Sequence, residues 1–380
     1  MIHGSAGSVG ASTRGSGARF GDLDVEIPGL GGPDPSIKSA SRLESRRFFG
    51  TVRGVFSAAH PGHWVAFLAF VLLALALDLG VFHRKSHTVG FREALGWTSV
   101  WTASAFLFAF AVAPRWVEGW GGAEATTFIT GYVVELSLSM DNVFVIALIF
   151  RYFKVPESWQ HRVLIWGILG ALLMRAVMIV AGAAVIQRFH WTLYLMGAFL
   201  VYTGLRMLRS AGSDDSVDPE QNPAVRLVRR FFPLSPTYDG ERFITVHAGR
   251  RMLTPLALVL LVVETTDVVF ALDSIPAIFG ITSNAFIVFT SNVFAILGLR
   301  SLYFVLASLM GYFRLLKYGL AVVLVFIGFK MLADHWLKAW LGAHLVNVSL
   351  GFVIGTILTS MLASVILRVR DQDPPNGAAR

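Results

Sequence analysis

The chain lacks cysteine entirely and has few charged residues. Only 15% of its 380 residues are charged, whereas a typical soluble domain has about 25%. Without cysteine the chain forms no disulfide of its own, offers no thiolate to a metal and carries out no thiol redox chemistry. Any metal ion must therefore be bound through oxygen or imidazole ligands.

Signatures of enzymes and of nucleic-acid binding are also missing. The sequence has no nucleophile elbow, nucleotide-binding loop or cofactor fingerprint, and its polar stretch 209–251 is too short for a catalytic domain. The net charge is +8, but no basic helix is interleaved with surface aromatics, so nucleic acid is not an expected partner. We predict a protein that is not an enzyme and has no resident cofactor.

Long apolar runs dominate the sequence. Hydrophobic residues make up 55% of the chain, and the mean hydropathy is +0.63. Runs of roughly 18 or more apolar residues indicate transmembrane helices. The predicted fold class is an all-α polytopic membrane protein with about nine such helices, at residues 64–81, 97–112, 127–150, 163–186, 193–208, 255–279, 285–310, 315–332 and 346–367.

The flanking segments and loop charges predict the organisation. Residues 1–62 are rich in Gly, Ser and Ala and indicate a disordered N-terminal tail. The membrane domain would cover 63–370, with a cytoplasmic loop at 209–251 and a C-terminal tail at 371–380. Lys and Arg concentrate in alternate connections, so the positive-inside rule puts the C-terminus in the cytoplasm and the N-terminus outside. We expect a bacterial inner-membrane protein in contact with the lipid bilayer.

Two of the apolar segments carry the same acidic pattern. In each, an acid is followed six residues later by Asp and then by Asn or Ser: Glu135 precedes Asp141, and Asp267 precedes Asp273. The resemblance continues downstream, so helices 3–5 match helices 6–8. An offset of three helices gives the two copies opposite topology. Inverted repeats are typical of transporters whose binding sites lie where the copies meet, near the membrane midplane.

The acids within these segments are the candidate ligands. Carboxylates at membrane depth cost about 2.5–3.5 kcal/mol each on insertion scales, so they mark ion paths. Oxygen ligands of this kind suit hard divalent cations such as Mn²⁺, Mg²⁺ and Ca²⁺. The candidate set is Glu135, Asp141, Asn142, Glu264, Asp267, Asp273 and Ser274. Structural roles stay open for each: a buried hydrogen bond for the acids, a helix cap for Glu264, and packing for Asn142 and Ser274.

Helix geometry constrains how this set can assemble. At 100° per residue, Asp141 and Asp273 point about 120° away from Glu135 and Asp267 on a straight helix. A shared site therefore requires bent or broken helices, for which Pro276 offers a cause in the second copy. Otherwise each acid serves a different stage of the path. Arg175 and Arg300 lie well inside their helices. They serve either as counter-ions to the acids or as residues that snorkel to the interface.

The two signatures resemble those of the TerC family of integral membrane proteins. The resemblance rests on TGYVVELSLSMDNVFV from Thr130, on ETTDVVFALDSIPA from Glu264 and on LDLGVFHRK from Leu77, and it covers about residues 64–368. It implies divalent metal export, chiefly of Mn²⁺, and an association with tellurium resistance. It also implies that the seven candidate residues line the ion path. Tellurite is an anion that carboxylates repel, so resistance would be indirect.

Two functions follow from these patterns. The first is a metal exporter working by alternating access, with divalent cations as substrate. The second is a membrane factor that transports nothing and supports the assembly or metallation of other membrane or secreted proteins, which would then be its partners. The sequence leaves the ion selectivity and the coupling ion open, because Mn²⁺, Mg²⁺ and Ca²⁺ share a preference for oxygen.

Overall fold

The structure is a computed structural model that describes residues 59–82, 90–210, 230, 232–247, 249–309, 315–342 and 344–372. The chain divides into two units, Met1–Arg47 and Phe48–Arg380, and all described residues belong to the second. The predicted disordered tail lies outside the described residues except for its last four positions. Within those positions, the first described helix begins at Pro61. Residues 373–380 of the predicted C-terminal tail also lie outside.

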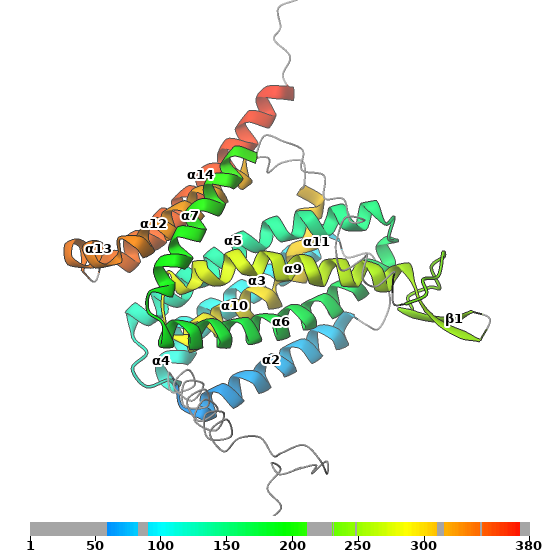
Figure 1. Cartoon of the computed structure of the whole chain (residues 1–380), viewed down its shortest axis with the longest axis horizontal. Coiled ribbons are helices and arrows are strands. Elements are labelled where there is room, and N and C mark those ends of the chain that lie inside the picture. The colour runs from blue at the N-terminus through cyan, green and yellow to red at the C-terminus, as the bar shows by residue number, and fades with distance from the viewer. Residues whose placement is uncertain are drawn as a thin grey trace, which may run out of the picture. The chain divides into compact units, whose positions relative to one another are not determined.

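Each of the nine predicted apolar segments is helical (Figure 1). Several helices extend beyond the predicted apolar runs, because polar turns at the ends of a helix lie outside the apolar span. The described helices are α2 (Pro61–Phe82), α3 (Phe91–Leu107), the π-helix η1 (Phe108–Val112), α4 (Ala113–Trp116), α5 (Gly122–Tyr152), α6 (Glu157–Arg188), α7 (Thr192–Ser210), α9 (Pro255–Phe279), α10 (Ala285–Leu297), α11 (Leu299–Leu309), α12 (Leu316–Leu332), α13 (Asp334–Leu341) and α14 (His344–Gln372).

Fewer helices than predicted meet the length and hydropathy of a membrane span. Five described helical segments do so on their own: Phe91–Trp116, α5, α6, α9 and the His344–Leu367 part of α14. The bent pairs α10–α11 and α12–α13 raise the number to seven. The all-α membrane class therefore holds, while nine spans and the inverted repeat stay predictions.

The bends lie in places that the sequence did not indicate. Helices α10 and α11 are bent by 46° around Gly298, and α12 and α13 by 87°. Helix α9 instead continues through Pro276, which lies in its last turn, where few backbone bonds depend on it. Helix α5 is likewise a single helix across its signature. The break that a single shared site would require is therefore absent from these two helices, which leaves the alternative that the acids act at different places.

Two hydrophobic clusters organise the packing. The larger joins α2, α3, α5, α6, α9, α10 and α11 around aromatic side chains such as Phe128 and Phe294. The smaller joins α7, α12 and α14 to one side of α5 and α9, through Leu200, Leu320 and Val353. Helices α7 and α12 run alongside each other in this cluster (Figure 1). Helices α5 and α9, which carry the acids, thus contact both clusters.

Glycines allow α7 and α12 to approach closely. A Cβ added at Gly328 would lie 2.6 Å from the Gly197 carbonyl oxygen, and one at Gly204 would lie 2.8 Å from the Ala321 oxygen. Such distances leave no room for a larger side chain. Small residues at a helix interface are a common device in membranes, where close backbone packing replaces the hydrophobic effect.

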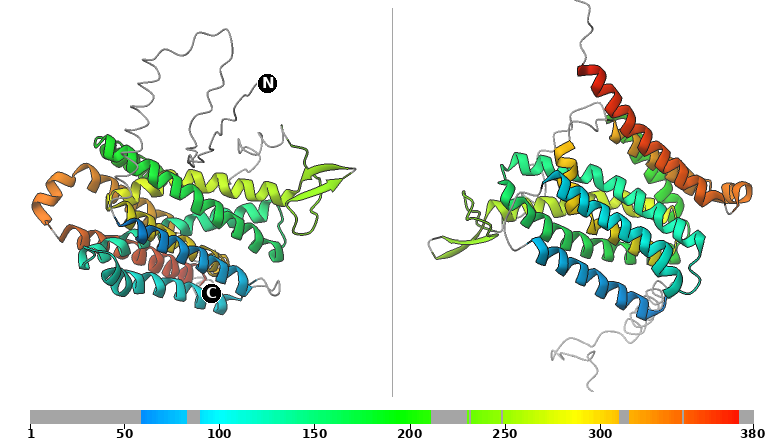
Figure 2. Two further views of the ribbon diagram at one scale, coloured as in Figure 1. Left: turned by 90° about the horizontal axis from the view of Figure 1, so that it is seen from below. Right: turned by 180° about the vertical axis from the view of Figure 1, so that it is seen from behind.

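The predicted cytoplasmic loop contains a hairpin that the sequence analysis missed. Strands β1 (Ile244–His247) and β2 (Arg250–Leu253) pair antiparallel, with Ile244 opposite Leu253. The hairpin lies beside the start of α9 (Figure 2). Before the hairpin, the Tyr238 hydroxyl donates to the Phe153 carbonyl at 2.8 Å, and burial raises the pKa of the Tyr238 phenol. The loop is thereby fixed to the end of α5.

Candidate ion-binding site

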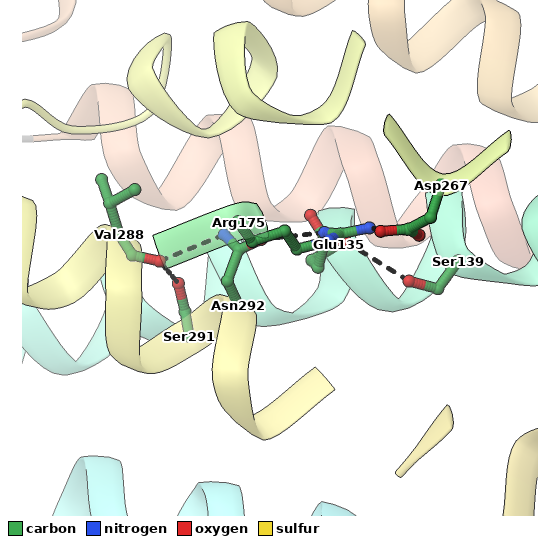
Figure 3. Close-up of polar contacts among 7 residues, drawn as sticks. All are labelled: Glu135, Ser139, Arg175, Asp267, Val288, Ser291 and Asn292. Carbon is green, nitrogen blue, oxygen red and sulfur yellow. Dashed lines mark hydrogen bonds and ion pairs between the residues drawn. The ribbon is translucent and has the colours of Figure 1, made fainter. Parts of the chain in front are cut away.

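A buried arginine joins the two acidic signatures. Arg175 of α6 donates through Nη1 to Glu135 Oε1 of α5, and its Nη2 lies 3.5 Å from Asp267 Oδ1 of α9. Glu135 and Arg175 are only 1% and 2% exposed. Figure 3 shows the guanidinium reaching toward both carboxylates. The first acid of each signature therefore contacts one shared cation, so Arg175 has the counter-ion arrangement rather than the snorkelling one.

An amide that the sequence analysis missed completes this cluster. Asn292 of α10 accepts from Arg175 Nη1 through Oδ1 at 3.0 Å and donates through Nδ2 to the Val288 carbonyl at 3.1 Å (Figure 3). Asn292 is 1% exposed. It lies outside both signatures, so the repeat did not reveal it. A polar run of Thr, Ser and Asn within an otherwise apolar span was the available signal.

Glu264 lies beside the cluster because α6 has a glycine opposite it. A Cβ at Gly170 would overlap the Glu264 carboxylate. Glu264 precedes Asp267 by three residues on α9, so the two carboxylates lie on the same side of the helix and repel one another. The Ser139 hydroxyl donates to Glu135 Oε1 at 3.3 Å. Three of the predicted acids are thus gathered around α6.

The second acid of each signature faces different neighbours. Asp141 interacts electrostatically with Lys317 of α12. Asp273 interacts with Thr203 and Arg206 of α7. Both aspartates are half-buried. The structure therefore places Asp141 and Asp273 toward the smaller hydrophobic cluster, away from Arg175, as the straight-helix geometry requires.

The remaining candidates are buried polar residues. Asn142 is 5% exposed and Ser274 is 3% exposed. Among the described residues, neither Ser274 Oγ nor Asp267 Oδ2 has a hydrogen-bond partner. Arg300, which the predicted repeat would match to Arg175, is 4% exposed and has interactions of its own. Buried oxygen atoms without partners are costly to desolvate, and this makes them available to an incoming cation.

The seven predicted ligands do not form one closed metal site. Within the described ranges, no three Asp, Glu or His side chains are arranged to hold a metal ion. Instead, Glu135 and Asp267 share Arg175, which Asn292 also contacts, and Glu264 lies next to them. Two other aspartates, Asp141 and Asp273, lie apart and face exposed cationic side chains. Such an arrangement can exchange one cation for another, because the acids already have a cationic partner.

Comparison with known proteins identifies the family. The model of the integral membrane protein TerC family matches residues 120–372. The chain belongs to the TerC family. The resemblance of its two signatures is thereby confirmed, and the matched range contains all seven candidate ligands and both arginines.

This TerC family member matches its relatives over nearly their full lengths. It is 49% identical over 310 residues to an uncharacterized membrane protein of Myxococcus xanthus, covering 82% of this chain and 94% of the relative. It is 42% identical over 323 residues to Alx of Escherichia coli K12, which its name describes as a proposed membrane-bound redox modulator, covering 83% and 98%. An uncharacterized membrane protein of Rickettsia bellii is 36% identical over 303 residues, covering 80% and 97%. No solved structure matches the chain.

Proposed function

We propose that this TerC family member exports divalent metal ions, with Mn²⁺ as the principal substrate. The observation that carries the proposal is the convergence of Glu135 and Asp267 on Arg175 deep within apolar helices. Ionisable residues at membrane depth are expensive and mark ion pathways. Replacing a buried ion pair by well-packed apolar residues is often neutral or stabilising, so stability alone gives little reason for these charges.

The chemistry of the pathway supports a hard divalent cation. The available ligands are carboxylate, amide and hydroxyl oxygens, and the chain has no cysteine for softer metals. Asp141 and Asp273 would hold the ion at a different stage from Glu135 and Asp267, because the two pairs face different helices. An alternating-access cycle, with α5–α7 and α9–α12 as inverted copies, would pass the ion between the two pairs.

Redox and tellurium phenotypes would be secondary to metal movement. The name of Alx proposes redox modulation for that protein, but this chain has no thiol to oxidise. A carboxylate-lined path repels the tellurite anion. Both phenotypes would therefore follow from a change in the cytoplasmic pool of a redox-active or enzyme-activating metal.

Flux measurements test the proposal directly. Protein reconstituted in liposomes should carry Mn²⁺ down an imposed gradient, and Asp267→Asn, Asp141→Ala and Asp273→Ala should each reduce the rate at least tenfold. Asp334→Asn, a change in a solvent-exposed ion pair of α13, is the matched control and should retain the wild-type rate. Wild-type flux equal to that of protein-free liposomes would overturn the proposal. Everted vesicles then give the direction of transport.

A second candidate is the non-transporting factor that supports assembly or metallation of membrane or secreted proteins. The observation that favours it is that Arg175 already pairs with Glu135 and Asp267. No group of three acids or histidines among the described residues is placed to hold a metal ion. This role predicts no flux but normal folding, and loss of a partner protein from membranes of cells that lack the chain.

A further inference from the structure

The Arg175 guanidinium occupies the position between Glu135 Oε1 and Asp267 Oδ1, where a divalent cation bridging these two oxygens would lie. A hard cation must come within about 2.0–2.6 Å of an oxygen of each carboxylate, and Arg175 Nη1 and Nη2 already approach Glu135 Oε1 and Asp267 Oδ1. A guanidinium cannot give up its charge in a protein. The two cations therefore repel each other and cannot both bind between these acids.

We propose that Arg175 is a tethered cation that the transported ion displaces, and that Asn292 is the positioning residue that retains Arg175 when this happens. The inference rests on the transport function proposed above and specifies how its site is regulated. While Arg175 lies between the two acids, its single positive charge offsets one of their two negative charges, so an incoming ion must compete with it. Only an ion of higher charge gains enough from both carboxylates to displace it.

Asn292 is suited to this role because its orientation is fixed independently of the acids. Its Nδ2 donates to the Val288 carbonyl one turn back on α10, and this directs Oδ1 toward Arg175 Nη1 at 3.0 Å. The amide is uncharged, so it offers Arg175 an acceptor without adding a further negative charge beside the acids. Without Asn292, a displaced Arg175 would be left charged and unpaired in a buried site.

The neighbouring Ser291 offers a matched control. It is as buried as Asn292, but its hydroxyl donates only to carbonyls of its own helix, at Ile287 and Val288. Ser291→Ala therefore tests disturbance of α10 without touching Arg175. Any effect specific to the retention of Arg175 should be seen at Asn292 and not at Ser291.

Two changes at Asn292 should act in opposite directions. Asn292→Leu removes the acceptor that a displaced Arg175 requires, so the apparent KM for Mn²⁺ should rise about tenfold, the effect of losing one hydrogen bond to a charged group, with kcat little changed. Asn292→Asp offers Arg175 a charged partner, which draws it away from the acids, so KM should fall by a similar factor. The fall should vanish in the Arg175→Gln background, since no cation is left to retain.

The decisive experiment measures Mn²⁺ binding and flux for these variants in the full chain, with circular dichroism to confirm that they fold. Opposite shifts at Asn292, absent at Ser291→Ala and absent without Arg175, establish the inference. Equal shifts for Asn292→Leu and Ser291→Ala, or an Asn292→Asp effect that persists in Arg175→Gln, overturn it. Binding that follows the pattern without wild-type flux would sink the transport function alone. If the wild-type protein shows neither Mn²⁺ binding nor Mn²⁺ flux, both the transport function and this inference are overturned.

Discussion

The two acids of each signature lie one and two-thirds helical turns apart and contact different helices. Glu135 and Asp267 both contact the buried Arg175; Glu135 is 1% exposed and Asp267 is half-buried. Asp141 and Asp273 are half-buried and face Lys317 and Arg206, which are exposed. The same six-residue spacing on two unbroken helices therefore gives one pair of acids a buried cation and the other pair exposed ones.

This difference separates what the two pairs contribute. A fully buried carboxylate next to a buried arginine contributes to the fold as well as to any ion path, because removing either partner leaves the other charged and unpaired. A half-buried carboxylate beside an exposed lysine or arginine contributes little stability, since solvent screens the pair. Function is thus more separable from stability at Asp141 and Asp273.

Removing an acid of the inner pair, Glu135 and Asp267, should have the largest effect on stability. Glu135→Leu leaves Arg175 without its closest partner and should lower the free energy of unfolding by about 3–5 kcal/mol, the range measured for breaking buried ion pairs. The matched change Asp141→Leu should alter it by less than about 1 kcal/mol. Thermal unfolding in detergent measures both, and similar losses for the two variants would contradict the division between the pairs.

The outer pair, Asp141 and Asp273, faces helices α12 and α7, which pack closely against each other. Gly328→Ala places a methyl group 2.6 Å from the Gly197 carbonyl oxygen, so it should destabilise the protein by about 1–3 kcal/mol, as overpacking typically does. Flux should fall as well, since Lys317 and Arg206 lie on these two helices. Gly355→Ala is the control, because a Cβ there meets nothing within 4 Å, and thermal unfolding of both variants checks the prediction.

The division between the pairs also explains how far the sequence could predict the site. The acids, their spacing and the helices that carry them follow from local pattern alone, because a charge in an apolar run is conspicuous. The angular separation of Asp141 from Glu135 was predictable from helix geometry. That α5 and α9 stay unbroken was not, because the effect of Pro276 depends on how near it lies to the end of its helix.

Contacts between distant segments were beyond the sequence. Asn292 meets Arg175 across 117 positions, and no repeat or spacing connects them. Gly170 makes room for Glu264, yet a glycine in a membrane helix has many other uses. The pairing of strands β1 and β2 was missed because the polar composition of residues 209–251 indicates a loop equally well.

Neutralising the cations of the outer pair should affect transport more than stability. Lys317→Gln and Arg206→Gln remove exposed charges near Asp141 and Asp273, so the free energy of unfolding should change by no more than about 1 kcal/mol. The apparent Mn²⁺ affinity should rise a few-fold at low salt, where less repulsion opposes the ion, and the gain should shrink at high salt. A gain that is independent of salt would argue against an electrostatic cause.

The smallest expected change in stability distinguishes two serines on the acid-bearing helices. Ser274 Oγ is buried and has no hydrogen-bond partner among the described residues, so Ser274→Ala should be neutral or slightly stabilising, because it removes an unsatisfied polar group. Ser139→Ala loses the bond to Glu135 Oε1 and should cost about 0.5–1.5 kcal/mol. If Ser274 binds the ion together with Asp273, its alanine variant should combine unchanged thermal stability with slower Mn²⁺ flux. Unchanged flux would show that Ser274 is not part of the ion path, and Asp273 would then be the candidate ligand in that turn of α9.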